Sequence, residues 1–83
     1  MSINQTVTVN SFYFVNKQGE TLRTFPREIT WNGRYITFKD GLRYLVGQGT
    51  QIFDMVDAWG RQTYRLRRDG DSWTLLTAKG ASV

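Results

Sequence analysis

The dipeptide Asn32-Gly33 constrains the fold of this chain more than any other feature, because it separates two apolar runs. A type I′ turn requires positive φ at both central residues, and Asn-Gly adopts that conformation with little strain. We therefore predict a β-hairpin in which residues 28–32 pair with residues 34–38. The two-residue turn sets the register and places three pairs opposite each other: Trp31 with Arg34, Ile29 with Ile36, and Thr30 with Tyr35.

The segment before this hairpin predicts two more strands. Residues 6–15 are rich in β-branched and aromatic side chains, as strands are. Their apolar positions change face midway, which indicates a bulge near Asn10-Ser11 or a strand that is covered on both faces. A polar turn over residues 16–20 leads into a return strand. Because Pro26 has no backbone N–H to donate, we expect residues 21–27 to form a sheet edge or the start of a new pairing.

The sequence after the hairpin predicts a second turn, at residues 39–41. We expect a three-residue loop in which Gly41 is left-handed, because this register keeps apolar residues together on one face. It directs three side chains of the next strand toward the core: Leu42 opposite Phe38, Tyr44 opposite Ile36, and Val46. Residues 47–50 then form a flexible connection.

Residues 51–59 are ambiguous, since their apolar positions fit either a helix or a strand. The strand is favoured, because a helix would have to reverse into the next strand with almost no connecting residues. A four-residue loop over 58–61 and a two-residue turn at Asp69-Gly70 then connect three strands. These turns pair six apolar side chains on one face: Met55 with Tyr64, Phe53 with Leu66, Leu66 with Trp73, and Tyr64 with Leu75.

These elements indicate an all-β chain of 83 residues. We expect a meander of six or seven short antiparallel strands that closes into an SH3-like barrel, because closure removes exposed strand edges. An OB-like or other meander barrel is the second choice, and an α+β fold with a helix at residues 50–59 is the alternative. We expect residues 1–83 to form a single domain, with residues 1–5 and 78–83 frayed.

The chain contains neither cysteine nor histidine, and this argues against several classes of chemistry. Histidine is the usual general base near neutral pH, and the two residues are the common ligands of zinc and iron–sulfur clusters. We therefore expect no catalytic residue, no metal site and no cofactor. The first residues carry no basic segment followed by an apolar run, and no stretch approaches the roughly 18 apolar residues of a membrane span. The sequence is typical of a soluble, cytoplasmic protein that is not an enzyme and has no membrane partner.

The formal net charge is +4, and its distribution matters more than its size. Four arginines and four aspartates lie within residues 54–71, so this stretch is neutral as a whole. Arg61, Arg65 and Arg67 project from one strand face there, where guanidinium groups can contact phosphates. The alternative is a solvated, ion-paired face on which Asp54 lies beside Arg65.

Two tryptophans are further candidates for a binding site. Trp31 and Arg34 can form a stacking platform for a nucleobase or a peptide side chain, or simply a core residue that an arginine covers. Trp59 lies in the predicted loop, where it is either a binding anchor or a plug over the mouth of the barrel.

We conclude from the sequence that the chain is a small non-enzymatic binding module, monomeric or homodimeric. A protein–protein interaction domain or a small subunit of a complex, with an unknown protein partner, is the first hypothesis. The alternative is a nucleic-acid-binding barrel that holds single strands through arginine and aromatic contacts. Phosphate-driven affinity falls steeply as salt rises, whereas an apolar protein interface responds little, so salt dependence separates the two hypotheses.

Overall fold

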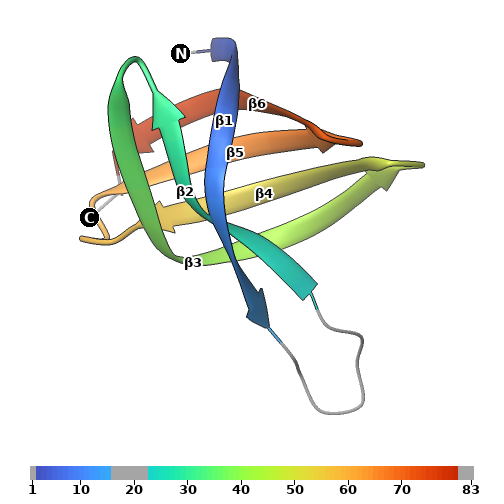
Figure 1. The fold of residues 1–83 in the computed structure, drawn as a ribbon, viewed down its shortest axis with the longest axis horizontal. Helices are drawn as coiled ribbons and strands as arrows, with labels where there is room; N and C mark the ends of the chain where they lie inside the picture. Colours follow the sequence, from blue (N-terminus) through green and yellow to red (C-terminus); the bar gives the residue numbers. More distant parts are fainter. Residues whose placement is uncertain (1, 16–22, 81–83) are drawn as a thin grey trace.

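The structure is a computed structural model that describes residues 2–15 and 23–80, which form a closed antiparallel barrel (Figure 1). Consecutive strands pair along the chain, and the pairing of β1 with β6 closes the barrel. The strands are β1 (Ser2–Val15), β2 (Arg23–Trp31), β3 (Arg34–Gly47), β4 (Thr50–Asp57), β5 (Gln62–Asp69) and β6 (Ser72–Gly80). The prediction of an all-β meander that closes into a small barrel is confirmed. In this part of the chain no helix is long and apolar enough to cross a membrane.

The hairpin between β2 and β3 has the predicted geometry. Asn32 and Gly33 have φ values of 52° and 71°, the positive values that a type I′ turn needs. The three predicted pairs are all present: Trp31 with Arg34, Thr30 with Tyr35, and Ile29 with Ile36. The dipeptide therefore fixes the register of β2 on β3.

β1 pairs with a different neighbour along each half. Its first half pairs with β6 and its second half with β2, and the predicted bulge lies between Val9 and Ser11. A second register shift follows immediately. Beyond it Tyr13 stacks on the buried Phe25 with ring centroids 5.4 Å apart, while Phe12 is 38% exposed.

The first residues of β2 form a sheet edge, as the proline indicated. β3 pairs with β2 only from Glu28 onward, so residues 23–27 have β1 as their strand neighbour on one side. Pro26 lies in this segment beside the register shift, where its missing N–H removes no bond to β3. The predicted polar turn at residues 16–20 lies outside the described residues.

β3 differs from the prediction, because no turn interrupts it at residues 39–41. The strand continues for 14 residues, and a register shift between Phe38 and Asp40 bends it from β2 onto β4. Gly41 lies opposite Met55, where an added Cβ atom would overlap the end of the Met55 side chain and lie 3.0 Å from the backbone oxygen of Asp54. The glycine is therefore required for the close approach of two strands and not for a left-handed turn.

The turn from β3 into β4 lies at Gln48-Gly49, where Gly49 has a φ of 75°. Gly47 pairs with Thr50 across it, so residues 47–50 form a tight turn and not the flexible connection that we expected. Because β3 continues past residue 41, three side chains that we expected in the core are exposed instead: Leu42 by 62%, Tyr44 by 46% and Val46 by 63%.

Residues 50–57 form strand β4, so the strand prediction is confirmed and the helix alternative is wrong. Residues 58–61 connect β4 to β5, as the predicted four-residue loop requires. The register of β4 on β5 is also the predicted one: Met55 with Tyr64, Phe53 with Leu66, and Asp54 with Arg65.

The turn between β5 and β6 lies one residue later than predicted, at Gly70-Asp71. Asp69 pairs with Ser72, so Leu66 lies opposite Leu75, and Trp73 lies opposite Arg68. The partner of Leu66 thus moves by two residues, from Trp73 to Leu75, so these side chains keep their inward face. A register shift between Arg65 and Leu66 also places Tyr64 opposite Ala78, and not opposite Leu75 as predicted. The six predicted inward side chains are all buried: Phe53, Met55, Tyr64, Leu66, Trp73 and Leu75.

The core of the barrel is built around the ring of Phe53, which is fully buried. Its centroid lies 5.7 Å from that of Phe25 in an edge-on contact and 5.2 Å from that of Trp73. Such pairs contribute about 0.5–1.5 kcal/mol each beyond the burial of their area. The strands also include residues 2–5 and 78–80, which we expected to fray, and only residue 1 and residues 81–83 lie outside the described part of these ends.

We predict that Gly41→Ala lowers the free energy of unfolding by about 1–3 kcal/mol, because the added methyl group overlaps the Met55 side chain. Urea denaturation monitored by tryptophan fluorescence measures this loss. Gly47→Ala is the matched control: Gly47 lies in the same strand with nothing within 4 Å of its added Cβ, and the change should stay within about 0.5 kcal/mol of zero. Equal losses in the two variants would contradict the packing role of Gly41.

Candidate functional site

Four of the six predicted binding residues gather at one end of the barrel. The β2–β3 turn, the β4–β5 loop, the start of β1 and the end of β6 all lie at this end, on the left of Figure 1. Trp31 and Arg34 flank the turn, and Trp59 and Arg61 lie in or beside the loop. We call the hollow between these elements the mouth pocket.

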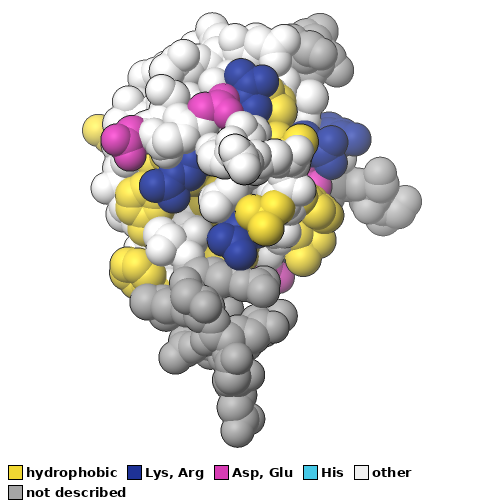
Figure 2. Space-filling model, turned by 90° about the vertical axis from the view of Figure 1, so that its right-hand side faces the viewer, with side chains coloured by type: hydrophobic (Ala, Val, Ile, Leu, Met, Phe, Trp, Pro, Cys, Tyr) yellow, Lys and Arg dark blue, Asp and Glu magenta, His cyan; other side chains and the backbone are white. Residues whose placement is uncertain are grey.

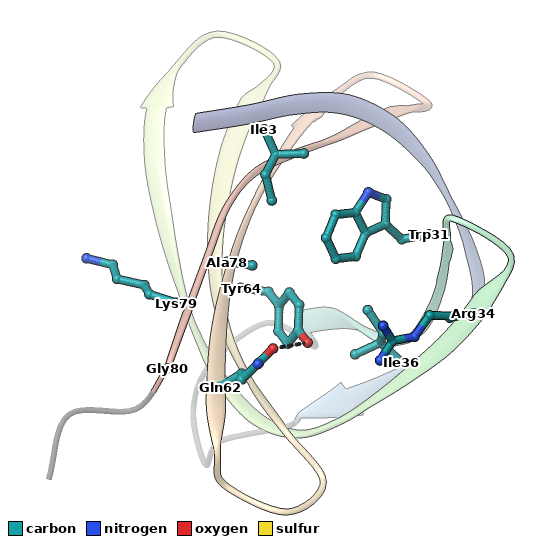
Figure 3. Close-up of a pocket in the computed structure, with 9 residues that line it drawn as sticks. All are labelled: Ile3, Trp31, Arg34, Ile36, Gln62, Tyr64, Ala78, Lys79 and Gly80. Carbon is teal, nitrogen blue, oxygen red and sulfur yellow. Dashed lines mark hydrogen bonds between the residues drawn. The ribbon is translucent and has the colours of Figure 1, made fainter. Parts of the chain in front are cut away.

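The mouth pocket has a volume of about 390 Å³ and is shown in Figure 3. Five strands contribute to it, since the barrel closes around it. Its apolar surface comes mainly from Ile3, Trp31, Ile36 and Ala78, and its polar rim from Arg34, Gln62, Tyr64, Lys79 and Gly80. The pocket therefore combines an apolar interior with polar groups at its opening, which is the usual composition of a small-ligand site.

Two hydrogen bonds hold the aromatic rings of the mouth pocket in place. The Trp31 indole Nε1 donates to Oε1 of Gln5 in β1 at 2.5 Å. The Tyr64 hydroxyl donates to Oε1 of Gln62 at 2.6 Å. The Trp31 ring is therefore held by a residue of the neighbouring strand β1 and the Tyr64 ring by a residue of its own strand β5 before any ligand is present.

Trp31 and Arg34 lie opposite each other, as predicted, but they do not form a stacked pair. In Figure 3 the Arg34 side chain extends beside Ile36, apart from the Trp31 ring. The guanidinium that lies over an indole belongs to Arg68, 5.3 Å from the centroid of Trp73, near the opposite end of the barrel. Sequence reasoning identified the two residues at the mouth but not the way in which they contribute to it.

Two exposed cations belong to the residues around the mouth, Arg34 and Lys79, and no carboxylate of the described residues lies within 4.0 Å of either. The Arg34 side chain lies at the hollow, whereas Figure 3 shows that the Lys79 side chain extends away from it. The nearly buried Asp57 serves the adjacent loop instead, because its Oδ1 accepts hydrogen bonds from the backbone N–H groups of Arg61 at 2.7 Å and Gln62 at 3.3 Å.

The pKa of the Tyr64 phenol lies above its ordinary value. Burial of the ring is the largest cause, and the negative charge of Asp57 adds to it. The positive charge of Arg34 acts in the opposite direction and lowers the pKa. Arg34 therefore lies close enough to the mouth pocket to act on groups inside it.

Arg65 and Arg67 lie away from the mouth, on the outer wall of the barrel. Arg65 donates two hydrogen bonds to Asp54, at 2.7 and 2.9 Å, in a bidentate ion pair. The Nε atom of Arg67 lies 2.9 Å from a carboxylate oxygen of Asp69. The structure therefore places both arginines in the ion-paired arrangement that we considered as the alternative to a phosphate-contacting stripe.

Trp59 neither fills the barrel nor lines the mouth pocket. Its side chain is 74% exposed in the β4–β5 loop. This exposed position does not fit one of the two roles that we considered for Trp59, a plug over the barrel mouth.

The feature that the sequence did not reveal is the surface of β3 beyond the bulge, residues 42–46, which we call the β3 edge. Four of its side chains are apolar and strongly exposed: Leu42 by 62%, Tyr44 by 46%, Leu45 by 71% and Val46 by 63%. In the described part of the chain this segment has only β4 as a strand neighbour. The signal was the run Tyr44-Leu45-Val46, since three successive apolar residues cannot all point to one face of a strand.

A second, shallower hollow of about 410 Å³ lies where β1 leaves β6. Phe12, Arg68, Asp71 and Trp73 are among its lining residues. Figure 2 views the molecule from this end and shows hydrophobic and basic side chains interspersed on the surface. Arg68 covers the Trp73 ring here, while Phe12 is 38% exposed.

No protein-family model, curated protein or solved structure gives a significant match to this chain. The candidate residues are therefore assigned from geometry and chemistry alone.

We predict that the Tyr64 phenol titrates above 10.0, and that Arg34→Gln raises its pKa further by removing a nearby positive charge. The Tyr64 phenol of the unfolded chain loses its proton at a lower pH than that of the folded chain. The free energy of unfolding should therefore fall as the pH rises above 10.0. A ¹³C NMR titration of labelled tyrosine resolves Tyr64 from the other phenols. A lower Tyr64 pKa in Arg34→Gln than in the wild type would contradict the placement of Arg34.

Proposed function

We propose that this chain is a non-enzymatic protein-interaction module that binds an extended segment of a partner protein along the β3 edge. The observation that carries the proposal is the combination of strongly exposed apolar side chains with a strand segment that has β4 as its only strand neighbour among the described residues. Each feature alone is common on protein surfaces, and together they match strand addition.

The backbone of the β3 edge supports this mode of binding. Alternate N–H and C=O groups of a strand point away from its neighbour, so an edge presents a row of hydrogen-bonding groups to an added strand. β3 is covered on this side by β2 only as far as Thr37. Many proteins protect such edges with lysine, proline or a bulge, and here Lys39 and one register shift come just before Leu42, and the next register shift comes only between Leu45 and Gly47, so residues 42–45 pair regularly with β4.

The side chains around the β3 edge have the composition of an interface. On the outer face Leu42 lies opposite Asp54 and Tyr44 opposite Ile52, and the Asp54–Arg65 ion pair lies beside them. Apolar and aromatic side chains flanked by arginine are typical of the central part of protein interfaces. Because Asp54 already neutralises Arg65, this ion pair supports a protein interface better than a phosphate-binding surface.

The partner segment is expected to alternate aliphatic residues with at least one acidic residue. Aliphatic side chains match Leu42 and Tyr44, which share one face of β3. An acidic residue matches Arg43, which lies on the other face and has no carboxylate of the described residues within 4.0 Å. The net charge of +4 also favours an acidic partner over a second copy of this chain.

We predict that peptides selected from a random decapeptide library on the full chain show this alternating pattern and require the β3 edge. Leu45→Lys should weaken the binding of the best peptide at least about tenfold, because a lysine on a strand edge opposes strand addition. Tyr35→Lys is the matched control, since Tyr35 is 75% exposed on the same strand but lies where β2 covers the edge. Isothermal titration calorimetry measures both affinities, and equal losses would overturn the proposal.

Salt dependence and oligomeric state test the competing explanations on the same samples. The affinity for the peptide should change less than about threefold between 0.1 and 0.5 M salt, since apolar contacts respond little to screening. Binding of a single-stranded 12-mer DNA that falls steeply with salt and is lost in Arg65→Ala/Arg67→Ala would indicate the nucleic-acid module instead. A stable dimer in sedimentation that Leu45→Lys dissociates would identify a second copy as the occupant.

A further inference from the structure

We propose that the mouth pocket binds a small planar aromatic anion, with its ring between Trp31 and Tyr64 and its negative charge directed to Arg34. This site is separate from the β3 edge and does not depend on the function proposed for that edge. The argument rests on the size, the order and the charge of the pocket.

The size and shape of the mouth pocket suit a small flat molecule. Its volume of about 390 Å³ lies within the range of pockets that enclose small organic ligands, about 300–1,000 Å³. Figure 3 shows the Trp31 and Tyr64 rings on different sides of the hollow, with Ile3 and Ile36 between them around its wall. A planar ring placed there would contact two aromatic faces or edges, which is the geometry in which aromatic groups attract each other.

The pocket is ordered before binding. Gln5 fixes the indole of Trp31 and Gln62 fixes the hydroxyl of Tyr64, each through one hydrogen bond. Side chains that are already held in place lose little conformational freedom when a ligand arrives, and this reduces the cost of binding. With its Oε1 engaged by Tyr64, the Gln62 amide still has its NH₂ group to donate to a ligand.

The charge at the opening selects an anion. Arg34 begins β3 and its side chain lies at the hollow, whereas the Lys79 side chain extends away from it (Figure 3). Among the described residues no carboxylate lies within 4.0 Å of Arg34, in contrast to Arg65 and Arg67 on the outer wall. A carboxylate or a phosphate on the ligand would supply the missing partner, and guanidinium groups bind both in bidentate geometry.

Two matched probes test the proposal on the ¹⁵N-labelled full chain: 2-naphthoate and its neutral counterpart 2-naphthamide. We expect 2-naphthoate to shift the Trp31 indole N–H signal and the backbone signals of Gln62 and Gly80, with a Kd on the order of 0.1–1 mM. We expect 2-naphthamide to bind about tenfold more weakly, because it lacks the charge. Adenosine 5′-monophosphate is the third probe and distinguishes a nucleotide from an aromatic carboxylate as the source of the anion.

Single substitutions test the contribution of Arg34. Arg34→Gln should weaken the binding of 2-naphthoate about five- to tenfold and leave that of 2-naphthamide unchanged, whereas Lys79→Gln, whose side chain extends away from the hollow, should change the affinity less than about twofold. Arg67→Gln removes the same charge from the outer wall, where Asp69 pairs with it, and should change the affinity less than about twofold. All three positions are exposed, and the wild-type amide spectrum provides the test that each variant is folded.

Three results would overturn the proposal. The first is the absence of saturable shifts with either anionic probe at about 5 mM, since weaker binding is not specific for a preformed pocket. The second is equal affinity for 2-naphthoate and 2-naphthamide. The third is an equal loss in Arg67→Gln, which would indicate a general effect of net charge and not a site.

Discussion

Closure of the barrel depends on two strands, β1 and β3, each of which changes its neighbour partway along its length. In each strand a register shift follows just after this change, between Val9 and Ser11 in β1 and between Phe38 and Asp40 in β3. A bulge increases the local twist and bends the strand, which lets one strand turn the corner of a small barrel. The bends also let the second half of β3 pass out of reach of β2. The same feature that closes the core around Phe53 therefore leaves the β3 edge uncovered.

The sequence predicted those parts of the fold that depend on face alternation and on turns with positive φ. Asn32-Gly33 set the first hairpin, and the position of the β5–β6 turn was wrong in a way that preserved alternation, so the inward side chains were still correct. Gly41 was misinterpreted because glycine has two physical uses that look identical in a sequence. It permits a left-handed turn, or it permits a second strand to approach, and only the position of Met55 in space distinguishes them.

The candidate sites were predictable to the extent that their residues are neighbours in a register. The Asp54–Arg65 ion pair followed from the pairing of β4 with β5, and the Trp31–Arg34 pair followed from the hairpin. The position of Arg34 at the same pocket as Tyr64 did not follow from either, because the two residues lie in strands that are not adjacent in the barrel. The sequence alone does not show which residues meet when the barrel closes, so it does not show which groups surround Arg34 at the mouth.

The mouth pocket and the β3 edge are connected by one strand, which begins at Arg34 and passes through Ile36 and Phe38 before it reaches Leu42. Ile36 and Phe38 are buried, and the bulge at Lys39 lies between them and the exposed segment. A close-packed core has low compressibility and does not transmit small side-chain adjustments as continuous bending. Sites separated by such a core and sharing no side chain contribute independently to binding and stability. A ligand in the mouth and a strand on the β3 edge should therefore bind with additive free energies, and cooperativity between them would mean that β3 has a second arrangement at its bulge.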